Sequence, residues 1–322
     1  MPKTSSPIRV GVVGVGAIGA LHARIYARFP RLAKLVAVYD ADAARARSVA
    51  RQVGCRVARR FEDLVSQVQA ASVCVPTSRH HTVGTALLEH GIPVLIEKPI
   101  AATLKEADDL LARAARRRLV LQVGHLERFN AAIQAAQQYL TRPRFIEAHR
   151  LSPYPFRGTD VSVVLDLMIH DLDLVLSLVK TQPGRIDALG VAVLSGSEDI
   201  ANARLVFPTG CVANLTASRV SDETIRRIRL FQEDGYLSID YHRQTAELAR
   251  KLGRAIRRRT LSVKRRQPLD DQLVSFLKAV RTGERPLVSG TDAREALALA
   301  LKIEQTMRRR PVRRGQTPLV KG

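Results

Sequence analysis

The sequence predicts a protein of two domains: an α/β domain with a parallel sheet, followed by an α+β domain built on antiparallel strands. Short apolar strands alternate with helices over residues 1–123, whereas strands joined by turn residues dominate the chain after residue 124. A length of 322 residues also suits two domains that each bury a core. We assign residues 1–123 to the first domain and 124–290 to the second. We expect a helix at 291–310 to pack back on the first domain and residues 311–322 to form a basic tail.

The first domain contains five expected strands separated by helices. The strands are Ile8–Val13, Leu35–Tyr39, Ala71–Val75, Pro93–Ile96 and Val120–Val123, and the helices are Leu21–Arg28, Ala43–Val53, His81–His90 and Leu104–Arg118, with a helical patch near Phe61–Gln67. Strands that alternate with helices at this spacing form βαβ units, so the sheet is expected to be parallel.

The second domain begins with helices and then becomes rich in strands. The expected helices are Asn130–Leu140, Val163–Val179, Asp270–Arg281 and Asp292–Arg310, and the expected strands are Phe145–Leu151, Asp187–Leu194, Ala201–Phe207, Gly210–Ser218, Thr224–Gln232 and Tyr236–Asp240. Pro208–Gly210 and Glu233–Gly235 have the composition of turns between paired strands, which indicates an antiparallel sheet. Residues 250–266 are interpreted as a linker.

The chain carries a formal net charge of +22, and this charge is concentrated in two segments. Residues 250–266 hold nine basic side chains and no acid, and residues 308–321 hold six more. Such a balance favours anionic partners. Aromatic residues make up only 4% of the chain and no nucleic-acid-binding motif is found, so we expect no specific nucleic acid partner. A solvated surface, the steering of a dianionic substrate, or a weak attraction to an anionic membrane surface would account for the charge.

Nothing in the sequence indicates secretion or membrane insertion. No apolar run reaches the roughly 18 residues that a membrane span needs. Glycines interrupt the apolar stretch near the N-terminus, unlike a signal peptide. The three cysteines lack CxxC spacing, which suits a reducing compartment. We therefore expect a cytoplasmic protein.

The segment Gly14–Gly19 reads GxGxxG between the first strand and a helix, and Asp40 ends the next strand. Glycines at these positions allow a tight turn and a close approach of a pyrophosphate, which the helix N-terminus attracts. A carboxylate at Asp40 would bind ribose hydroxyls and repel a 2′-phosphate, so NAD is favoured over NADP, although Arg45 lies nearby. The alternative is a glycine-rich turn without a ligand. The expected cofactor contacts here are Gly14, Gly16, Ala17, Ile18, Gly19 and Asp40.

Two further clusters carry chemistry. Lys98 follows a buried strand within Glu97-Lys98-Pro99, at the strand end where ligands bind in parallel sheets. Asp166, His170 and Asp173 share one face of an apolar helix, where unpaired ionisable groups would be costly. Lysine and histidine can both move a proton during hydride transfer. The alternatives are a solvent-exposed lysine, a structural histidine, or a metal site, for which no third clustered ligand is evident.

Five motifs in this order resemble the Gfo/Idh/MocA family of nicotinamide-dependent sugar oxidoreductases. They are Gly14–Gly19, Val75–His80, Glu97–Pro99, Gly124–Asn130 and Asp166-xxx-His170. The resemblance implies a Rossmann domain and a second domain with a large open, mostly antiparallel sheet, whose exposed face implies a homodimer or homotetramer. It implies Lys98, Asp166 and His170 as catalytic residues. It also places Pro76, Thr77, His80, Glu97 and Lys98 beside the cofactor.

The chain departs from the family pattern at Met168, where many members have glycine, and at Ala131, where proline is usual. The segments around Arg157–Asp160 and Ala217–Ser221 are most similar to the subgroup of UDP-N-acetylglucosamine 3-dehydrogenases, which act in lipid A precursor synthesis. The expected substrate contacts are Arg128, Asn130, Tyr154, Arg157 and Arg219. The sequence leaves open another sugar or a cyclitol as substrate. A basic binding protein with a relict dinucleotide fold is the remaining alternative.

Overall fold

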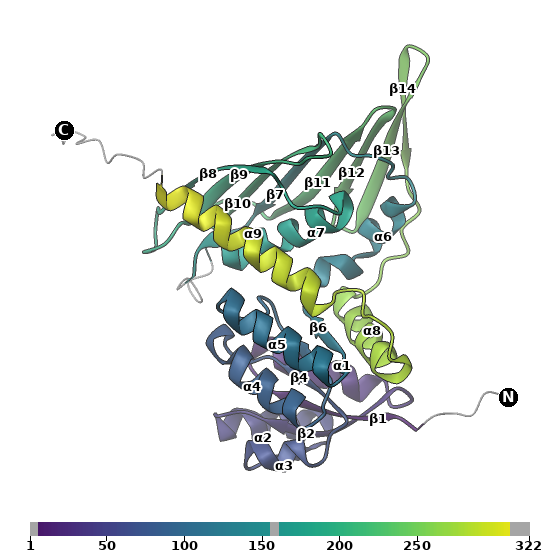
Figure 1. Ribbon diagram of the computed structural model, residues 1–322. Helices are drawn as coiled ribbons and strands as arrows, with labels where there is room; N and C mark the ends of the chain where they lie inside the picture. The colour runs from purple at the N-terminus through teal and green to yellow at the C-terminus, as the bar shows by residue number, and fades with distance from the viewer. Residues whose placement is uncertain (1–5, 155–160, 310–322) are drawn as a thin grey trace.

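The computed structural model describes residues 6–154 and 161–309 and shows two layered bodies stacked on each other (Figure 1). One body contains a six-stranded sheet and the other an eight-stranded sheet. The predicted fold class is confirmed, because the first sheet is entirely parallel and the second is antiparallel apart from one strand pair.

The parallel sheet has the strand order β3-β2-β1-β4-β5-β6. Its strands are β1 (Ile8–Val13), β2 (Ala33–Tyr39), β3 (Arg56–Val57), β4 (Ala70–Val73), β5 (Val94–Ile96) and β6 (Leu121–Val123). Every residue of β4, β5 and β6 is buried, as expected for central strands covered by helices on both faces.

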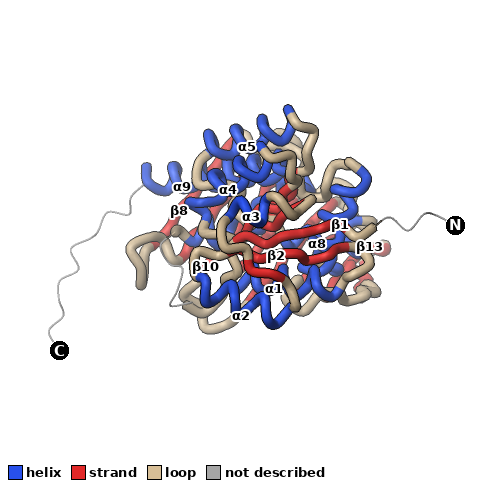
Figure 2. The backbone as a smooth tube through the Cα atoms, turned by 90° about the horizontal axis from the view of Figure 1, so that it is seen from below, coloured by secondary structure: helices blue, strands red, loops and turns tan. Residues whose placement is uncertain are grey.

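Five helices flank this sheet: α1 (Ala17–Arg28), α2 (Ala43–Val53), α3 (Phe61–Val65), α4 (Thr77–Glu89) and α5 (Leu104–Arg116). Figure 2 shows α1 and α2 on one side of the sheet and α4 and α5 on the other. Local sequence fixes several of their ends. The Asp42 side chain accepts from two N–H groups of α2, and Thr103 with Glu106 forms a capping box on α5.

The second sheet has the strand order β14-β13-β12-β11-β7-β10-β9-β8. Its strands are β7 (Phe145–Leu151), β8 (Arg185–Val191), β9 (Ile200–Val206), β10 (Val212–Ser218), β11 (Ile225–Gln232), β12 (Gly235–Asp240), β13 (Thr245–Leu252) and β14 (Ala255–Thr260). The strands β7 and β10 run parallel, and each pairs with an antiparallel neighbour on its other side.

Helices cover the face of the second sheet that is turned toward the first domain. These are α6 (Ala131–Gln137), α7 (Ile169–Val179) and α9 (Gly290–Arg309) (Figure 1). Alternation along β9 shows the two faces: Ala203 and Leu205 are buried beneath the helices, whereas Asn202 and Arg204 are exposed on the opposite face. That opposite face is open in the described part of the chain.

The chain passes between the two domains more often than the sequence division suggests. Helix α8 (Pro268–Thr282) falls within the range assigned to the second domain, yet Leu273 and Phe276 pack into the core around α1. Helix α9 contributes Leu297 to the core of the first domain and Ile303 to that of the second. The packing of α9 on the first domain is in line with the sequence expectation, whereas α8 departs from the assigned range because its apolar face is buried against α1 and early strands.

The interpretation of residues 250–266 as a linker is wrong for residues 250–260, which belong to the β13–β14 hairpin. Arg250 pairs with Arg257 across the hairpin, and Gly253 adopts a positive φ of 59° in its turn. Buried Leu248 anchors β13 to the sheet, while every residue from Ala255 to Thr260 is exposed. The hairpin projects past the rest of the sheet (Figure 1). Arginine-rich strands lack the apolar alternation by which strands are predicted.

Candidate functional site

The loop between β1 and α1 has the shape of a phosphate cradle. Gly14 has a φ of +83°, and a Cβ there would lie 2.7 Å from the Cys74 carbonyl oxygen. At Gly19 a Cβ would lie 1.8 Å from the Gly14 carbonyl oxygen. In contrast, no heavy atom of the described chain beyond its neighbours lies within 4 Å of a Cβ built on Gly16. Helix α1 begins at Ala17, and no side chain of the described residues caps its first turn. The backbone N–H groups of this turn, which includes Ile18, are therefore suited to bind a pyrophosphate.

Asp40 connects the end of β2 to this loop. One carboxylate oxygen accepts from the Val15 N–H at 2.7 Å, and the other accepts from the Asp42 N–H at 2.8 Å. The Arg45 guanidinium lies 3.6 Å from Asp40 and is half exposed. The carboxylate therefore stands beside the glycine loop, where a ribose would lie, with a positive charge next to it.

Lys98 lies at the carboxyl end of β5 and reaches across to the second domain. Its Nζ donates to the backbone carbonyl of Asp166 at 2.7 Å and to the Asp166 carboxylate at 3.2 Å. The two side chains are 21% and 29% exposed, so the pair is accessible at the domain junction. This contact brings together two of the three residues that we expect to be catalytic.

The helix expected over residues 163–179 is interrupted at its start. Val164–Met168 form a π-helical turn, and the regular helix α7 begins only at Ile169. Asp166 sits in this wide turn, and Lys98 bonds its carbonyl oxygen. Such turns are frequent at functional sites because they reorient the backbone of a helix.

His170 lies one turn further along, at the boundary between surface and interior. The residue is half-buried, and its Nδ1 atom is buried without a hydrogen-bond partner in the described part of the chain. Burial, followed by the positive charges of Lys98 and Arg150, lowers the pKa of His170 well below its usual value. The imidazole is thus neutral near pH 7 and can accept a proton only if the proton is passed on.

The Glu97 side chain contacts the backbone of Lys98 and a neighbouring histidine. Its carboxylate accepts from the Lys98 N–H at 3.3 Å and lies 3.3 Å from His22. Burial raises the pKa of Glu97, but the contact with His22 and the charge of Lys98 outweigh it, so this pKa is below its usual range. A Cβ at Gly124 would lie 2.6 Å from this carboxylate, so only glycine leaves room for it.

The resemblance implied that His80 lies beside the cofactor, but its side chain is enclosed by the protein. It is 1% exposed, and its two ring nitrogens lie 2.8 Å from the Pro99 carbonyl oxygen and 2.9 Å from that of Val75. Both nitrogens are therefore used within the protein. Exposed Pro76 and half-buried Thr77 remain at the carboxyl end of β4, at the start of α4.

Comparisons with known proteins agree with this geometry. Residues 8–125 match the family model described as an oxidoreductase family with an NAD-binding Rossmann fold, and residues 133–238 match the Gfo/Idh/MocA C-terminal domain. UDP-N-acetylglucosamine 3-dehydrogenase from Acidithiobacillus ferrooxidans is 38% identical over 305 residues, which cover 92% of this chain and 96% of that protein. The chain belongs to the Gfo/Idh/MocA oxidoreductase family.

Relatives and solved structures extend this assignment. The solved structure of the Acidithiobacillus ferrooxidans enzyme matches with a TM-score of 0.89 at 37% identity, over 93% of this chain and 97% of that one. Myo-inositol 2-dehydrogenase from Thermotoga maritima is 26% identical over 93% of this chain and 96% of that protein. Levoglucosan dehydrogenase in complex with NADH and levoglucosan shares the fold, with a TM-score of 0.86 at 16% identity over 94% of this chain and 98% of that one. The protein is a nicotinamide-dependent oxidoreductase that acts on CH–OH groups.

Two of the expected substrate contacts are structural in this Gfo/Idh/MocA protein. Asn130 is buried and caps α6 through the Ala132 N–H, while its amide donates to the Tyr241 carbonyl at 2.8 Å. Arg219 is fully buried and pairs with Asp199 at 2.9 Å. Since neither side chain reaches solvent, neither can contact a diphosphate.

The other three expected substrate contacts have different outcomes. Arg128 lies 3.5 Å from the carboxylate of Asp173 and donates to the Leu287 carbonyl. Tyr154 is half-buried just after β7. Arg157 lies outside the described residues.

The sequence analysis did not identify Arg226, an exposed cation near the catalytic candidates. Arg226 lies on the helix-covered face of β11, on the same side as buried Ile228, and opposite Arg150 in register. Its charge contributes to the lowered pKa of His170, so the two are close. Within the described residues no carboxylate lies within ion-pair distance of Arg226. The alternation within Thr224–Gln232 could have identified it, because Arg226 shares the parity of Ile228 and Leu230.

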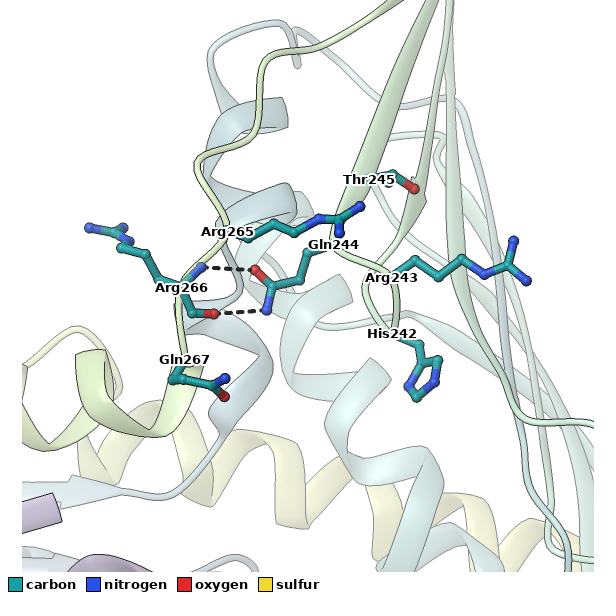
Figure 3. A pocket seen from close by; sticks show the side chains of 7 residues that line it. All are labelled: His242, Arg243, Gln244, Thr245, Arg265, Arg266 and Gln267. Carbon is teal, nitrogen blue, oxygen red and sulfur yellow. Dashed lines mark hydrogen bonds between the residues drawn. The ribbon is translucent and has the colours of Figure 1, made fainter.

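A separate basic cavity of about 640 Å³ lies at the end of the same sheet (Figure 3). It is lined by His242, Arg243, Gln244, Thr245, Arg265, Arg266 and Gln267. The Gln244 amide donates to the Arg266 carbonyl at 2.8 Å and thereby fastens the chain before α8 to the β12–β13 turn. None of the three catalytic candidates lines this cavity.

Proposed function

We propose that this enzyme is an NAD-dependent dehydrogenase that acts at C3 of a nucleotide-linked amino sugar such as UDP-N-acetylglucosamine, in a lipid A precursor pathway. The hydrogen bonds from Lys98 to Asp166 carry this proposal, because they assemble an amine and a carboxylate at the carboxyl end of the parallel sheet. The near-complete alignment with a UDP-N-acetylglucosamine 3-dehydrogenase supports the substrate class.

The residues divide the chemistry between them. Bound NAD supplies a nicotinamide that exchanges a hydride with the carbinol carbon of the sugar. Asp166 orients the Lys98 ammonium, which stabilises the sugar oxygen as its proton leaves. Because Nδ1 of His170 is buried, we expect Nε2 to face the sugar hydroxyl and to accept its proton.

The preference for NAD rests on Asp40. Its carboxylate is fixed beside the glycine loop by the Val15 N–H, where it can accept from both ribose hydroxyls. A 2′-phosphate would meet this negative charge, which outweighs the exposed Arg45 at 3.6 Å.

We also propose that Arg226 replaces Arg219 as a contact for the diphosphate. Arg226 is exposed, faces the catalytic residues, and has no acidic partner in the described part of the chain. A guanidinium of this kind can bind phosphate oxygens through two parallel hydrogen bonds.

A second candidate substrate is another sugar or a cyclitol, which the similarity to a myo-inositol 2-dehydrogenase over nearly the whole chain favours. The deciding experiment is a screen of NAD and NADP reduction by the full-length protein with UDP-N-acetylglucosamine, unlinked N-acetylglucosamine and myo-inositol. We expect turnover with the nucleotide sugar and NAD. Turnover with the unlinked compounds alone would refute the nucleotide-sugar assignment.

The partners and location follow from the same fold. We propose a homodimer or homotetramer formed through the open face of the eight-stranded sheet. None of the helices in the described ranges is long and apolar enough to cross a membrane. Three free cysteines support our proposal of a cytoplasmic location.

The β13–β14 hairpin supports a weak attraction to an anionic membrane surface. Leu252 and Ile256 at its tip are 57% and 62% exposed. Lys251, Arg254 and Arg257 surround them, and no described carboxylate lies within ion-pair distance of these cations. Aliphatic side chains among basic ones suit a lipid headgroup region better than a nucleic acid, because the tip offers no aromatic ring for stacking.

A further inference from the structure

A cluster of buried polar side chains adjoins His170. His125 precedes a 3₁₀ turn (Leu126–Phe129) and is 1% exposed, and Asp173 on α7 is 2% exposed. Among the described residues, four of their buried polar atoms have no hydrogen-bond partner. These atoms are His125 Nδ1, His125 Nε2, His170 Nδ1 and Asp173 Oδ2.

The members of this cluster are close to one another. The rings of His125 and His170 meet edge to face, with centroids 6.2 Å apart and planes at 84°. The charge of Asp173 acts on His125, and Arg128 lies 3.5 Å from the Asp173 carboxylate. The cluster therefore runs from the catalytic histidine through the interior to Arg128.

Arg128 marks the far end of this line. It borders an open cavity of about 760 Å³ that also exposes Asp292 and Glu295. Lys98, Asp166 and His170 do not line this cavity. A polar connection thus extends from the catalytic residues to a second surface of the protein.

Buried polar groups in proteins are normally satisfied by the chain or by ordered water, and four unsatisfied atoms in one place are rare. No protein atom in the described ranges satisfies these four. We propose that ordered water binds between His125, His170 and Asp173, and that this hydrated cluster relays the substrate proton from His170 to the cavity beside Arg128. This proposal rests on the proposed dehydrogenase function.

The relay conserves one proton and involves no redox change. The sugar hydroxyl gives its proton to His170 Nε2 as the proton on Nδ1 passes to the water. His125 takes one proton from the water and gives another to Asp173, which releases it toward the cavity. Sugar reduction would run the same steps in reverse.

The electrostatic surroundings suit transfer rather than storage of the proton. Lys98, Arg150 and Arg226 surround His170, so an imidazolium there is disfavoured. Lys98, Glu97, Arg128 and Asp173 surround His125. Burial raises the pKa of Asp173, although His125 and Arg128 oppose this, so its carboxylate can take up a proton more readily than an exposed one.

The test compares two substitutions of one residue in the full-length enzyme. His125→Phe keeps an aromatic ring but removes both nitrogens, whereas His125→Gln keeps polar atoms. We expect His125→Phe to lower kcat at least about tenfold with little change in KM for NAD or sugar. Activity should recover with rising pH, because hydroxide then removes the proton. His125→Gln should restore part of the loss at neutral pH. His149→Phe, at a partly exposed position on β7, serves as the matched control.

Two readouts separate the relay from a structural role and from a failed function assignment. A high-resolution crystal structure should show ordered water within hydrogen-bond distance of His170 Nδ1, whichever sugar is the substrate. A dry cluster would overturn the proposal, and so would a His125→Phe enzyme that loses only thermal stability while keeping its kcat and pH profile. If His125→Phe does not fold, Asp173→Asn is read by the same criteria. Wild-type inactivity toward every compound in the screen would refute the proposed function and leave the crystallographic readout standing.

Discussion

The Nδ1 atom of His80 lies 2.8 Å from the carbonyl oxygen of Pro99, so the first turn of α4 is tied to the residue that follows Lys98. The other ring nitrogen lies 2.9 Å from the Val75 carbonyl oxygen at the end of β4. Burial lowers the pKa of His80, and a neutral imidazole donates to only one of these two carbonyls at a time. The ring thus lies between two neighbouring loops at the carboxyl edge of the parallel sheet, one residue from Lys98.

Replacement of His80 should therefore affect both stability and catalysis. His80→Phe removes the N–H that the neutral imidazole donates to a buried carbonyl oxygen, and we expect the free energy of unfolding to fall by about 1–3 kcal/mol. Turnover should fall further than stability alone explains, because Lys98 loses its support. Urea unfolding and kcat measure the two effects. His90→Phe, at an exposed position at the end of the same helix, should change neither.

The buried Arg219–Asp199 pair should dominate the acid stability of the second domain. Burial raises the pKa of Asp199, but hydrogen bonds from Ser195, the Leu194 N–H and Arg219 outweigh it and hold this pKa below its unfolded value of 3.8. The carboxylate is thus stabilising above that value, and its contribution is lost as pH falls below about 4. Asp199→Asn should flatten the dependence of unfolding free energy on pH in that range.

Arg219→Met leaves the Asp199 carboxylate buried without its guanidinium, which we expect to cost about 3–5 kcal/mol in unfolding free energy. Arg51→Met, at an exposed position of α2, is the control and should change stability by less than about 0.5 kcal/mol. Equal losses in both variants would contradict the structural role of Arg219.

Gly16 should be needed by the cofactor and not by the fold. The space around a Cβ at Gly16 is open in the described chain, so Gly16→Ala should leave the melting temperature of the free protein unchanged. The added methyl group would occupy the space of the pyrophosphate, so thermal protection by NAD should be largely lost. Gly196→Ala, which is equally unhindered, should keep that protection. Full protection of Gly16→Ala would disprove the placement of the pyrophosphate.

Arg226 should determine affinity for a nucleotide-linked substrate. Arg226→Met removes the exposed guanidinium near His170, and we expect KM for the nucleotide sugar to rise at least about tenfold while KM for NAD stays constant. Arg227 lies on the opposite face of the same strand, so Arg227→Met provides the control. A rise in KM of the same size for Arg227→Met would exclude the assignment.

The hairpin tip should bind anionic vesicles independently of catalysis. We expect the Arg254→Glu/Arg257→Glu double variant, and separately Leu252→Ser/Ile256→Ser, to sediment much less with vesicles that contain phosphatidylglycerol. Arg51→Glu/Arg117→Glu changes the net charge equally on the first domain and should sediment as the wild type does. Similar losses in both charge variants would show that net charge alone drives the attraction.

The sequence was most informative where chemistry depends on local spacing. The glycine loop, Asp40, Lys98 and the Asp166–His170 pair follow from short motifs at strand ends and along one helix. The structure adds that Lys98 bonds the backbone of Asp166 as well as its carboxylate, through a π turn that no periodicity reveals.

Side chains whose role depends on distant partners could not be predicted. Arg219 and Asp199 lie twenty positions apart, and His80 bonds a carbonyl nineteen positions away. The sequence alone does not show whether an arginine forms a buried ion pair or faces solvent. For this reason it suggests Arg219 as a substrate contact, although Arg219 is buried and Arg226 is exposed. The β13–β14 hairpin was not predicted because its many arginines replace the alternation of apolar and polar residues that is typical of a strand.

Helix α9 has a mechanical consequence for how the enzyme works. One end of this rigid rod is embedded in the core beneath the NAD-binding sheet, and the other is embedded under the eight-stranded sheet. The two halves of the molecule cannot swing apart about a flexible joint near residue 124 without bending or extracting the rod. Any motion that separates Lys98 from Asp166 would therefore have to bend α9 or withdraw one of its ends from a core.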